Sequence, residues 1–384
     1  MEPGRLQELY GIYIHIPFCI RKCPYCDFYS VTDLSLIPRF VGAVIREIEM
    51  PDRSPVAIDT IFFGGGTPSV LTAGRISDIL DAIRRCFDVS ADAEITMEVN
   101  PGAIHVRELR CLHKAGVNRV NIGIQSFDDQ ALGFLGRIHS AADGLRAVEA
   151  ARRAGIDNIG IDLIFGLPGQ TPAQWRQDLD TAVRLDPEHL SCYQLTYETG
   201  TRMAADLEAN KFQALSEENA AEMFDQTGRF LASAGYARYE ISNFAVSPSR
   251  RSRHNLKYWT FAPYLGFGPS AHSFSGRRRS WNVAGIDDYL ARMAAGEAPT
   301  EGEETIDRTR GMTEAIYLGL RLADGISITG FNDCFQADFA GIFGKASALM
   351  ESMGLLKTEN GRCRLTNQGM RFADGIAGRL IEAI

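Results

Sequence analysis

The segment GIYIHIPFCIRKCPYCDFY, residues 11–29, decides the fold class because it joins a strand pattern to a dense group of cysteines. Residues 11–16 (GIYIHI) carry no Asp, Glu, Lys or Arg, which is typical of a buried parallel strand. Cys19, Cys23 and Cys26 follow within eight positions. Thiolates are soft ligands that suit iron–sulfur clusters or zinc. The segment therefore predicts a metal site in the loop after the first strand.

The number of cysteines in this loop leaves two kinds of metal site open. A structural zinc ion normally takes four protein ligands, and His15 would complete the set here. A four-iron cluster held by three thiolates would instead keep one iron open to an outside ligand. Spacing alone does not separate the two interpretations.

Short runs rich in Ile and Val alternate with longer helical patterns through the first half of the chain, which indicates repeated strand–helix units. Six such units predict an α/β fold, a partial (β/α)6 TIM-like barrel, with a doubly wound sheet as the competing topology. In either topology, loops at the carboxyl ends of the strands carry the chemistry. Strands are predicted at residues 11–16, 58–63, 94–99, 117–124, 158–165 and 189–195, and helices at residues 36–50, 73–86, 106–115, 141–154 and 172–185.

The pattern changes after residue 240, so we predict three units: residues 1–240 as the strand–helix domain, 241–300 as a connecting segment and 301–384 as a C-terminal domain. One strand is expected at residues 236–244 and a linker at residues 297–304. The last unit combines helical patterns with a hairpin around the Asn360-Gly361 turn, which is typical of a winged helix. Its acidic residues outnumber its basic ones, which favours a lid or a partner-docking module over a DNA reader.

Composition narrows the class of protein. The chain has 384 residues, 45% of them hydrophobic and 23% charged, as in soluble globular proteins. A net charge of −8 disfavours a general nucleic-acid surface. Residues 1–10 lack the apolar stretch of a signal peptide, and the longest uncharged run, residues 258–276, is broken by two prolines. We therefore expect a cytoplasmic protein without an integral membrane segment. The remaining cysteines are expected in the core: Cys86, Cys111, Cys192, Cys334 and Cys363.

Further polar and glycine residues stand where the predicted strands end. Residues 64–66 are three glycines, which let a ligand approach backbone amides. Glu98, Gln125 and Arg137 lie in or after the third and fourth strands. Asp162 interrupts the apolar fifth strand, and a buried carboxylate there needs a ligand or a partner. An ion pair with Arg137 is the structural alternative.

The cysteine spacing, followed by the Gly-Gly-Gly-Thr-Pro loop at residues 64–68, resembles the radical S-adenosylmethionine (SAM) superfamily, in its coproporphyrinogen-dehydrogenase-like branch. The resemblance implies that Cys19, Cys23 and Cys26 hold a 4Fe-4S cluster and that SAM chelates the open iron. It also implies that residues at matching positions contact SAM. In HemN-type enzymes of this branch, those positions are divided between two SAM molecules. These positions are Tyr13, Gly65, Gly66, Thr67, Glu98, Gln125, Arg137 and Asp162. In addition, the ring of Tyr25 is expected beside the adenine.

Two features separate the members of that branch. HemN-type oxidases carry a further cysteine two residues after the third, where this chain has Phe28, and they begin with an extension longer than the ten residues found here. Residues 254–259 (HNLKYW) resemble the HNxxYW motif of HemW-type heme chaperones. The resemblance implies that His254 binds heme iron. His272, in the uncharged segment that follows, is a second candidate from the sequence itself. Groups expected against the macrocycle and its propionates are Tyr258, Trp259, Arg250, Arg251 and Arg253.

These features predict a heme chaperone that binds a 4Fe-4S cluster, SAM and heme and passes heme to acceptor proteins, membrane-associated ones included. The alternative is an enzyme, an oxygen-independent coproporphyrinogen III oxidase or another radical SAM catalyst acting on a porphyrin-like substrate. A nucleic-acid or tRNA-modifying protein forms a third class, which the net charge disfavours.

Overall fold

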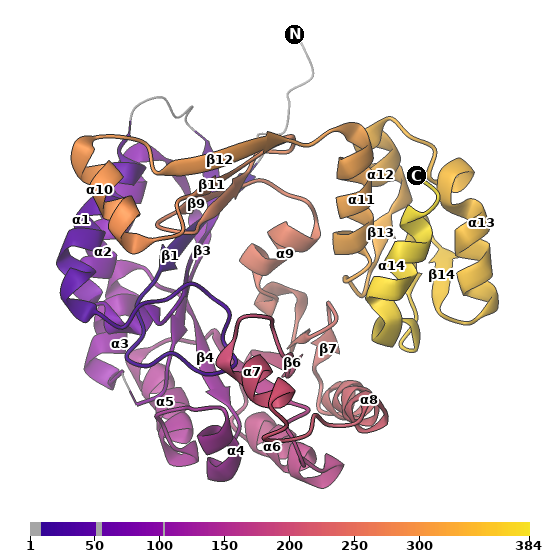
Figure 1. Cartoon of the computed structure of the whole chain (residues 1–384), viewed down its shortest axis with the longest axis horizontal. Helices are drawn as coiled ribbons and strands as arrows, with labels where there is room; N and C mark the ends of the chain where they lie inside the picture. Colours follow the sequence, from indigo (N-terminus) through magenta and orange to yellow (C-terminus); the bar gives the residue numbers. More distant parts are fainter. Residues whose placement is uncertain (1–8, 51–55, 103) are drawn as a thin grey trace.

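A twelve-stranded sheet forms the centre of the described part of the chain, which comprises residues 9–50, 56–102 and 104–384 of a computed structural model (Figure 1). Strands β1 to β6 are parallel and lie in sequence order, and β9 adds a further parallel strand beside β1. The strands are β1 Leu9–Ile16, β2 Ala57–Gly65, β3 Asp88–Val99, β4 Arg119–Gln125, β5 Ile159–Phe165, β6 His189–Gln194, β7 Ala237–Arg238, β8 Asn243–Ala245, β9 Tyr264–Phe267, β10 His272–Phe274, β11 Arg278–Asn282 and β12 Thr300–Thr305.

Helices connect successive parallel strands. Because each crossover is right-handed and leads to the next strand in order, the helices gather on one side of the sheet, as in a TIM-type barrel. The order β1 to β6 excludes the doubly wound topology, whose strand order reverses in the middle. The helices of this part are α1 Ile37–Ile48, α2 Ala73–Cys86, α3 Val106–Ala115, α4 Asp129–Phe134, α5 Ala141–Ala154, α6 Pro172–Arg184, α7 Arg202–Glu208, α8 Glu217–Ser233, α9 Arg253–Trp259 and α10 Ile286–Ala295, with 3-10 turns at Leu34–Leu36, Pro68–Val70 and Pro248–Arg250.

The partial (β/α)6 barrel is therefore confirmed, and its sheet is open because β12 and β7 end it at opposite edges. Local sequence explains several element ends. Thr171 caps α6 through Gln174, and Pro172 occupies the first helical position. Gly116 and Gly155 end α3 and α5 in the left-handed conformation that glycine accepts readily.

Three local expectations were wrong. Of the cysteines expected in the core, Cys192 and Cys363 are buried, but Cys111 and Cys334 are exposed because they lie on the outer faces of α3 and α12. The single strand expected at residues 236–244 is an antiparallel pair, β7 and β8, which bends back on itself. The linker expected at residues 297–304 contains the edge strand β12. Cross-strand ion pairs of Arg278 with Glu303 and of Arg279 with Glu304 join β12 to β11, so a charge-rich segment that resembles a linker forms a strand.

The C-terminal part is a winged-helix-like arrangement with its own apolar cluster, to the right in Figure 1. Helix α11 follows β12 directly, and a sheet of order β13-β15-β14 forms the wing. Residues Ile316, Phe331 and Phe343 lie in this cluster, and Phe224 of α8 packs against it. The elements are α11 Arg308–Gly319, β13 Ile326–Ser327, α12 Ile328–Phe335, α13 Phe339–Ser352, β14 Leu356–Glu359, β15 Arg362–Leu365, a 3-10 turn at Gly369–Phe372 and α14 Ala373–Ile381.

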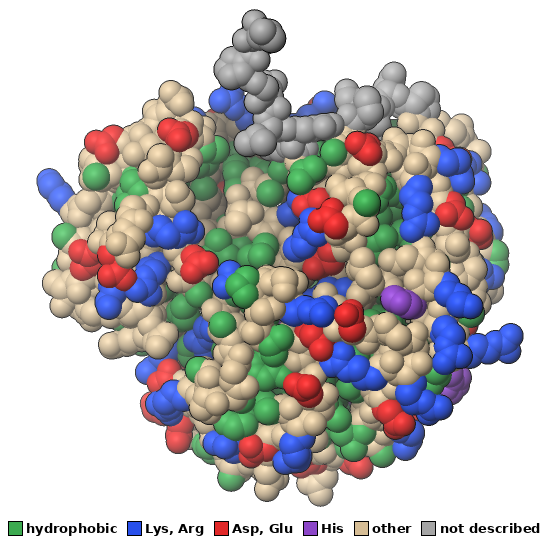
Figure 2. Space-filling model, turned by 180° about the vertical axis from the view of Figure 1, so that it is seen from behind, with side chains coloured by type: hydrophobic (Ala, Val, Ile, Leu, Met, Phe, Trp, Pro, Cys, Tyr) green, Lys and Arg blue, Asp and Glu red, His purple; other side chains and the backbone are tan. Residues whose placement is uncertain are grey.

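The surface carries both signs of charge. On the face in Figure 2, Lys and Arg side chains are interspersed with Asp and Glu side chains. Within the described ranges, no helix is long and apolar enough to cross a membrane.

Candidate functional site: the cysteine loop and the barrel interior

The loop after β1 brings the three cysteines to the carboxyl ends of the strands. Cys19 is buried, and Cys23 and Cys26 are half-buried. A backbone hydrogen bond of 2.9 Å from Cys19 N to Val31 O fixes the start of the loop. Burial, and then the neighbouring Cys23 and Cys19 thiols, raise the pKa of Cys26 to about 11. A bound metal reverses this preference because it takes only the thiolate.

The environment of the sulfurs fits an iron–sulfur cluster better than zinc. The Thr67 hydroxyl lies 3.5 Å from Cys19 Sγ, and an Arg137 guanidinium nitrogen lies 3.6 Å from Cys23 Sγ. Hydrogen-bond donors near the sulfur ligands adjust the reduction potential of an iron–sulfur cluster. His15, the fourth ligand that zinc would need, has its Nδ1 3.1 Å from the Tyr13 hydroxyl and its Nε2 3.0 Å from Tyr29 O. Among the described residues, no three His, Cys, Asp or Glu side chains gather closely enough for a single ion.

The glycine loop after β2 packs directly on the cysteine loop. Gly66 N donates to Ile16 O at 2.8 Å, and Thr67 N donates to Phe18 O at 2.7 Å. A Cβ atom at Gly66 would lie 2.7 Å from Phe18 O, so only glycine fits there. Gly65 has a φ of 108°, which also favours glycine. The glycine loop therefore packs closely on the backbone that leads into Cys19.

Arg137 connects the cysteines to the third and fourth strands. Its Nη2 atom donates to Asn100 Oδ1 at 2.7 Å and to Gly123 O at 2.8 Å. Asn100 in turn donates to the Thr67 hydroxyl at 2.9 Å. Gln125 ends β4 with a φ of 72°, a strained conformation for a residue other than glycine, and its amide lies against Gly123. The structure therefore brings Thr67, Gln125 and Arg137 together around the cysteine loop.

The inner face of the barrel carries two carboxylates. Burial, and then the charge of Asp162, raise the pKa of Glu98 to about 8. Burial also raises the pKa of Asp162, against hydrogen bonds from Ser191 and Asn121. Both Asp162 oxygens accept from Asn121 Nδ2, at 2.7 and 2.6 Å. Two buried carboxyl groups with raised pKa values on the inner face of a barrel are typical of a site that binds a polar or cationic ligand.

The structural alternative for Asp162, an ion pair with Arg137, is wrong. Asp162 takes its partners from the neighbouring strands β4 and β6, because Gly123 and Ser191 are its register neighbours and Asn121 shares its face. Arg137 is directed toward Cys23 instead. Asn100, Asn121 and Ser191 are members of the site that sequence reasoning missed. The signal for Asn121 was a polar residue inside the Ile- and Val-rich strand β4.

The two tyrosines proposed to contact SAM have different surroundings. Tyr13 stacks on Phe62 at 6.2 Å, and burial and then the charge of Glu98 raise its pKa. Tyr25 packs beside the apolar cluster that contains Leu135 and Leu167. Burial likewise raises the pKa of Tyr25. Tyr13 therefore belongs to the barrel interior and Tyr25 to the cysteine loop.

His254 is the second residue of α9, and its ring contacts β2. Its side chain is 1% exposed, with Nδ1 2.9 Å from the Thr60 hydroxyl and Nε2 2.9 Å from the Tyr258 hydroxyl. The ring stacks on Phe62 at 5.1 Å. Burial, and then the Lys257 charge, lower the pKa of His254 to about 3. Both ring nitrogens are therefore engaged, and iron ligation by His254 requires at least one of these hydrogen bonds to break.

The arginines expected against the propionates are paired with carboxylates. Ion pairs join Arg250 to Asp157 at 3.4 Å and Arg251 to Asp324 at 3.5 Å. Arg253 pairs with Asp59 and Asp92 at 3.4 and 3.7 Å. These pairs hold the segment before α9 against the barrel and the C-terminal part.

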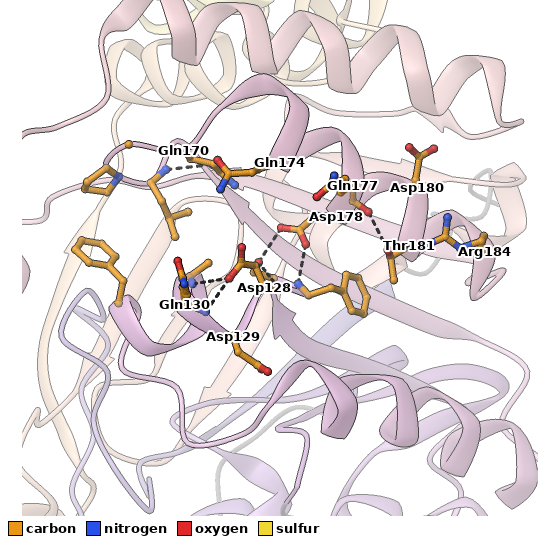
Figure 3. A pocket seen from close by; sticks show the side chains of 17 residues that line it. Asp128, Asp129, Gln130, Gln170, Gln174, Gln177, Asp178, Asp180, Thr181 and Arg184 are labelled. Carbon is orange, nitrogen blue, oxygen red and sulfur yellow. Dashed lines mark hydrogen bonds between the residues drawn. The ribbon is translucent and has the colours of Figure 1, made fainter.

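A hollow between α4 and α6 lies away from these residues (Figure 3). Its volume is about 740 Å³. Asp128 accepts the Gln130 and Ala131 amides and so caps α4, and Asp178 accepts Phe127 N at 2.7 Å. The polar groups that line it are therefore used to hold helices and loops, and no residue proposed from the sequence for a cofactor lines it.

Comparisons with known proteins agree with this arrangement. The family model of the radical SAM superfamily matches residues 13–182, and that of the HemN C-terminal domain matches residues 306–372. The heme chaperone HemW of Bacillus subtilis is 33% identical over 373 residues, covering 96% of this chain and 98% of the relative. The heme chaperone HemW of Escherichia coli is 40% identical over 267 residues, covering 68% of this chain and 69% of the relative.

A solved structure shares the fold. Coproporphyrinogen III oxidase (HemN) of Escherichia coli superposes with a TM-score of 0.84 at 23% identity, covering 98% of this chain and 91% of that chain. The barrel, the cysteine loop and the family match together define a radical SAM protein, a class whose members bind a 4Fe-4S cluster and SAM. Within that superfamily, the chain belongs to the HemW family.

Proposed function

We propose that this protein is a heme chaperone: it binds heme, holds a 4Fe-4S cluster and SAM, and transfers heme to acceptor proteins in the cytoplasm or at the membrane. The observation that carries the proposal is the similarity along nearly the whole chain to relatives named heme chaperone HemW. Phe28 supports it, because this position holds a cysteine in HemN-type oxidases, and its side chain here is 60% exposed beside the cysteine loop.

In this proposal Cys19, Cys23 and Cys26 are the cluster ligands. The soft donor set and the nearby Thr67 and Arg137 donors both suit that role. When bound, the cluster supplies an open iron and one-electron chemistry. Thr67 and Arg137 orient the thiolates and stabilise their negative charge.

SAM carries a sulfonium and an amino group, both cationic, and an adenine. We propose that Glu98, Gln125 and Asp162 meet its polar groups from the inner face of the barrel, with Gly65, Gly66 and Thr67 offering backbone and hydroxyl contacts. The raised pKa of Glu98 supports this assignment, because a cationic ligand would favour the charged carboxylate that burial disfavours. Tyr13 and Tyr25 border this space from β1 and from the cysteine loop.

The domain boundaries remain our proposal at residues 240 and 300. The family model of the C-terminal domain begins at residue 306, close to the second boundary. The separate apolar cluster from Met312 to Leu380 supports an independent C-terminal module.

The test is made on one anaerobically reconstituted sample, divided between two assays. Heme is titrated into one part while the Soret absorbance is recorded, and coproporphyrinogen III with SAM and a reductant is supplied to the other. The proposal predicts saturable heme binding at one heme per chain and no conversion of coproporphyrinogen. Absence of a Soret change together with turnover of coproporphyrinogen III would establish the oxidase instead.

A further inference from the structure

A hollow of about 640 Å³ lies between the cysteine loop, the end of α4 and helix α7. Met203 N of α7 donates to Pro24 O at 2.9 Å, which fixes α7 beside the loop that follows β1 (Figure 1). We call this space the cysteine-loop hollow, because Cys23 and Cys26 line it. None of the residues proposed to contact SAM lines it. The hollow therefore gives access to two of the cysteines from a side on which no SAM contact is proposed.

Basic side chains outnumber acidic ones around this hollow, although the chain as a whole carries a net charge of −8. Asp206 is already engaged, because it pairs with Lys211 at 2.6 Å and with Arg202 at 3.6 Å. Arg21 and Lys22 are exposed, and neither forms an ion pair within the part of the chain that the structure describes. The charged residues of the hollow are Arg21, Lys22, Arg202, Lys211, Asp27 and Asp206. Its free positive charge therefore exceeds its free negative charge and suits an acidic partner.

Large apolar side chains are exposed around the same cysteines. Ile20, Phe28 and Ile138 are 51%, 60% and 56% exposed. Ile20 and Ile138 line one narrow pocket together with Arg21 and Cys23, so apolar and basic groups are neighbours here. Exposed apolar groups bordered by charged ones are typical of a surface that contacts another protein. We therefore infer a protein partner at this surface.

The cysteines indicate the kind of protein. In the proposed function the cluster supplies one-electron chemistry, and its electron has to come from a donor that approaches the cysteine ligands. Electron-transfer complexes bury little surface, less than about 1,200 Å², and opposite charges steer the two proteins together. A basic and partly apolar surface next to Cys23 and Cys26 has the properties that such a short-lived complex needs.

We propose that the cysteine-loop hollow, with Ile20, Phe28 and Ile138 around it, is the docking surface for an acidic one-electron carrier protein. This inference rests on the proposed function, since it requires the cluster. One electron passes from the reduced carrier to the cluster, so the redox centre of the carrier is oxidised by one electron, and no bond or proton is exchanged. Arg21 and Lys22 meet carboxylates of the carrier, and the three apolar side chains pack against it.

The experiment uses a plant-type ferredoxin, an acidic [2Fe–2S] protein, and the full-length chain with its cluster reconstituted under anaerobic conditions. Calorimetric titration with oxidised ferredoxin measures docking, and stopped-flow absorbance with reduced ferredoxin measures cluster reduction, each at low and at high ionic strength. Arg21→Glu/Lys22→Glu reverses the two free charges. Lys345→Glu/Lys357→Glu, at exposed positions of the C-terminal part, is the matched control.

We expect the Arg21→Glu/Lys22→Glu protein to bind ferredoxin about tenfold or more weakly and to be reduced about tenfold or more slowly at low ionic strength. The control should change either quantity by less than about twofold. Added salt should weaken docking to the wild type and remove most of the difference between the variants, because it screens exposed charges. Iron content is measured for each protein and should be equal.

The outcomes separate this inference from the function on which it rests. A reconstituted wild type without iron and sulfide would refute the cluster, and with it the proposed function. If the cluster is present and dithionite reduces it, but ferredoxin neither binds nor reduces it, the docking inference is wrong and the proposed function stands. Equal affinities and rates for Arg21→Glu/Lys22→Glu and its control would also refute the docking surface.

Discussion

Substitution of Glu98 by Gln is expected to stabilise the protein at high pH while it weakens SAM binding. Glu98 lies on the inner face of the barrel, where burial and then the Asp162 charge raise its pKa from the ordinary value of 4.5 to about 8. Gln keeps the shape of the protonated carboxyl and carries no charge. A residue that costs stability and is nevertheless placed beside the glycine loop is typical of a ligand-binding group.

The sign of the pH effect follows from proton binding. Between pH 4.5 and about 8, the native chain retains a proton that the unfolded chain has lost. The free energy of unfolding of the wild type therefore falls as pH rises through this window, and Glu98→Gln removes that fall. At 1.36 kcal/mol per pH unit, the difference at pH 9 reaches at most about 5 kcal/mol. Relaxation of solvent and dipoles around a buried charge makes the measured value smaller.

Urea denaturation at pH 5 and pH 9, without added SAM, measures this difference. We expect Glu98→Gln to gain stability relative to wild type at pH 9 and to differ little at pH 5, and to bind SAM more weakly. Glu149→Gln, at an exposed position with a weak ion pair to Arg153, is the control and should show no such pH dependence. Parallel pH profiles for wild type and Glu98→Gln would refute the reasoning.

Three further predictions test the cysteine loop and the barrel. Cys23→Ser should lower the iron and sulfide content of the reconstituted protein, because it removes a thiolate ligand, whereas the exposed Cys111→Ser should retain it; iron analysis measures both. Arg137→Gln removes a donor 3.6 Å from Cys23 Sγ and leaves Asn100 Oδ1 and Gly123 O without that partner. It should lower the free energy of unfolding, measured by urea denaturation, by about 2–3 kcal/mol and should make the cluster decay faster in air. Thr227→Val removes the hydroxyl that accepts from the buried Trp175 Nε1, 2.8 Å away. The free energy of unfolding should fall by about 1–3 kcal/mol, as measured by tryptophan fluorescence during urea denaturation.

Each of these predictions has a contradicting result. Equal iron content in Cys23→Ser and Cys111→Ser would place the cluster ligands elsewhere. An Arg137→Gln protein with wild-type stability and cluster lifetime would mean that the guanidinium does not support the loop. A neutral Thr227→Val substitution would show that another group satisfies Trp175.

The sequence predicted elements best where the relevant signals are close together along the chain. Helix α3 has the predicted bounds, and the cap of α6 at Thr171 with Pro172 is read from four consecutive residues. The carboxyl-end position of the cysteine loop follows in the same way from one strand and the loop behind it. Strand β12 was missed because its charges become strand signals only when paired with β11, which no local pattern reveals.

The contacts of the site depend on pairs distant in sequence. His254 binds Thr60, which is 194 positions away, and spacing carries no information on that partner. For Asp162 the sequence left a ligand or an Arg137 ion pair open and did not indicate Asn121, because the strand register that places Asn121 beside Asp162 cannot be read along the chain. The residue types of the site were therefore predictable, but their pairing required the fold.

Heme transfer tests the central claim most directly. The cluster-reconstituted, heme-loaded chain is mixed with the apo form of a b-type heme protein of the membrane, the two are separated by an affinity tag, and heme is measured on each. The account predicts that heme leaves this chain and appears on the acceptor with the acceptor's own spectrum. Heme that stays on this chain at equilibrium with a competent apo acceptor would contradict a chaperone.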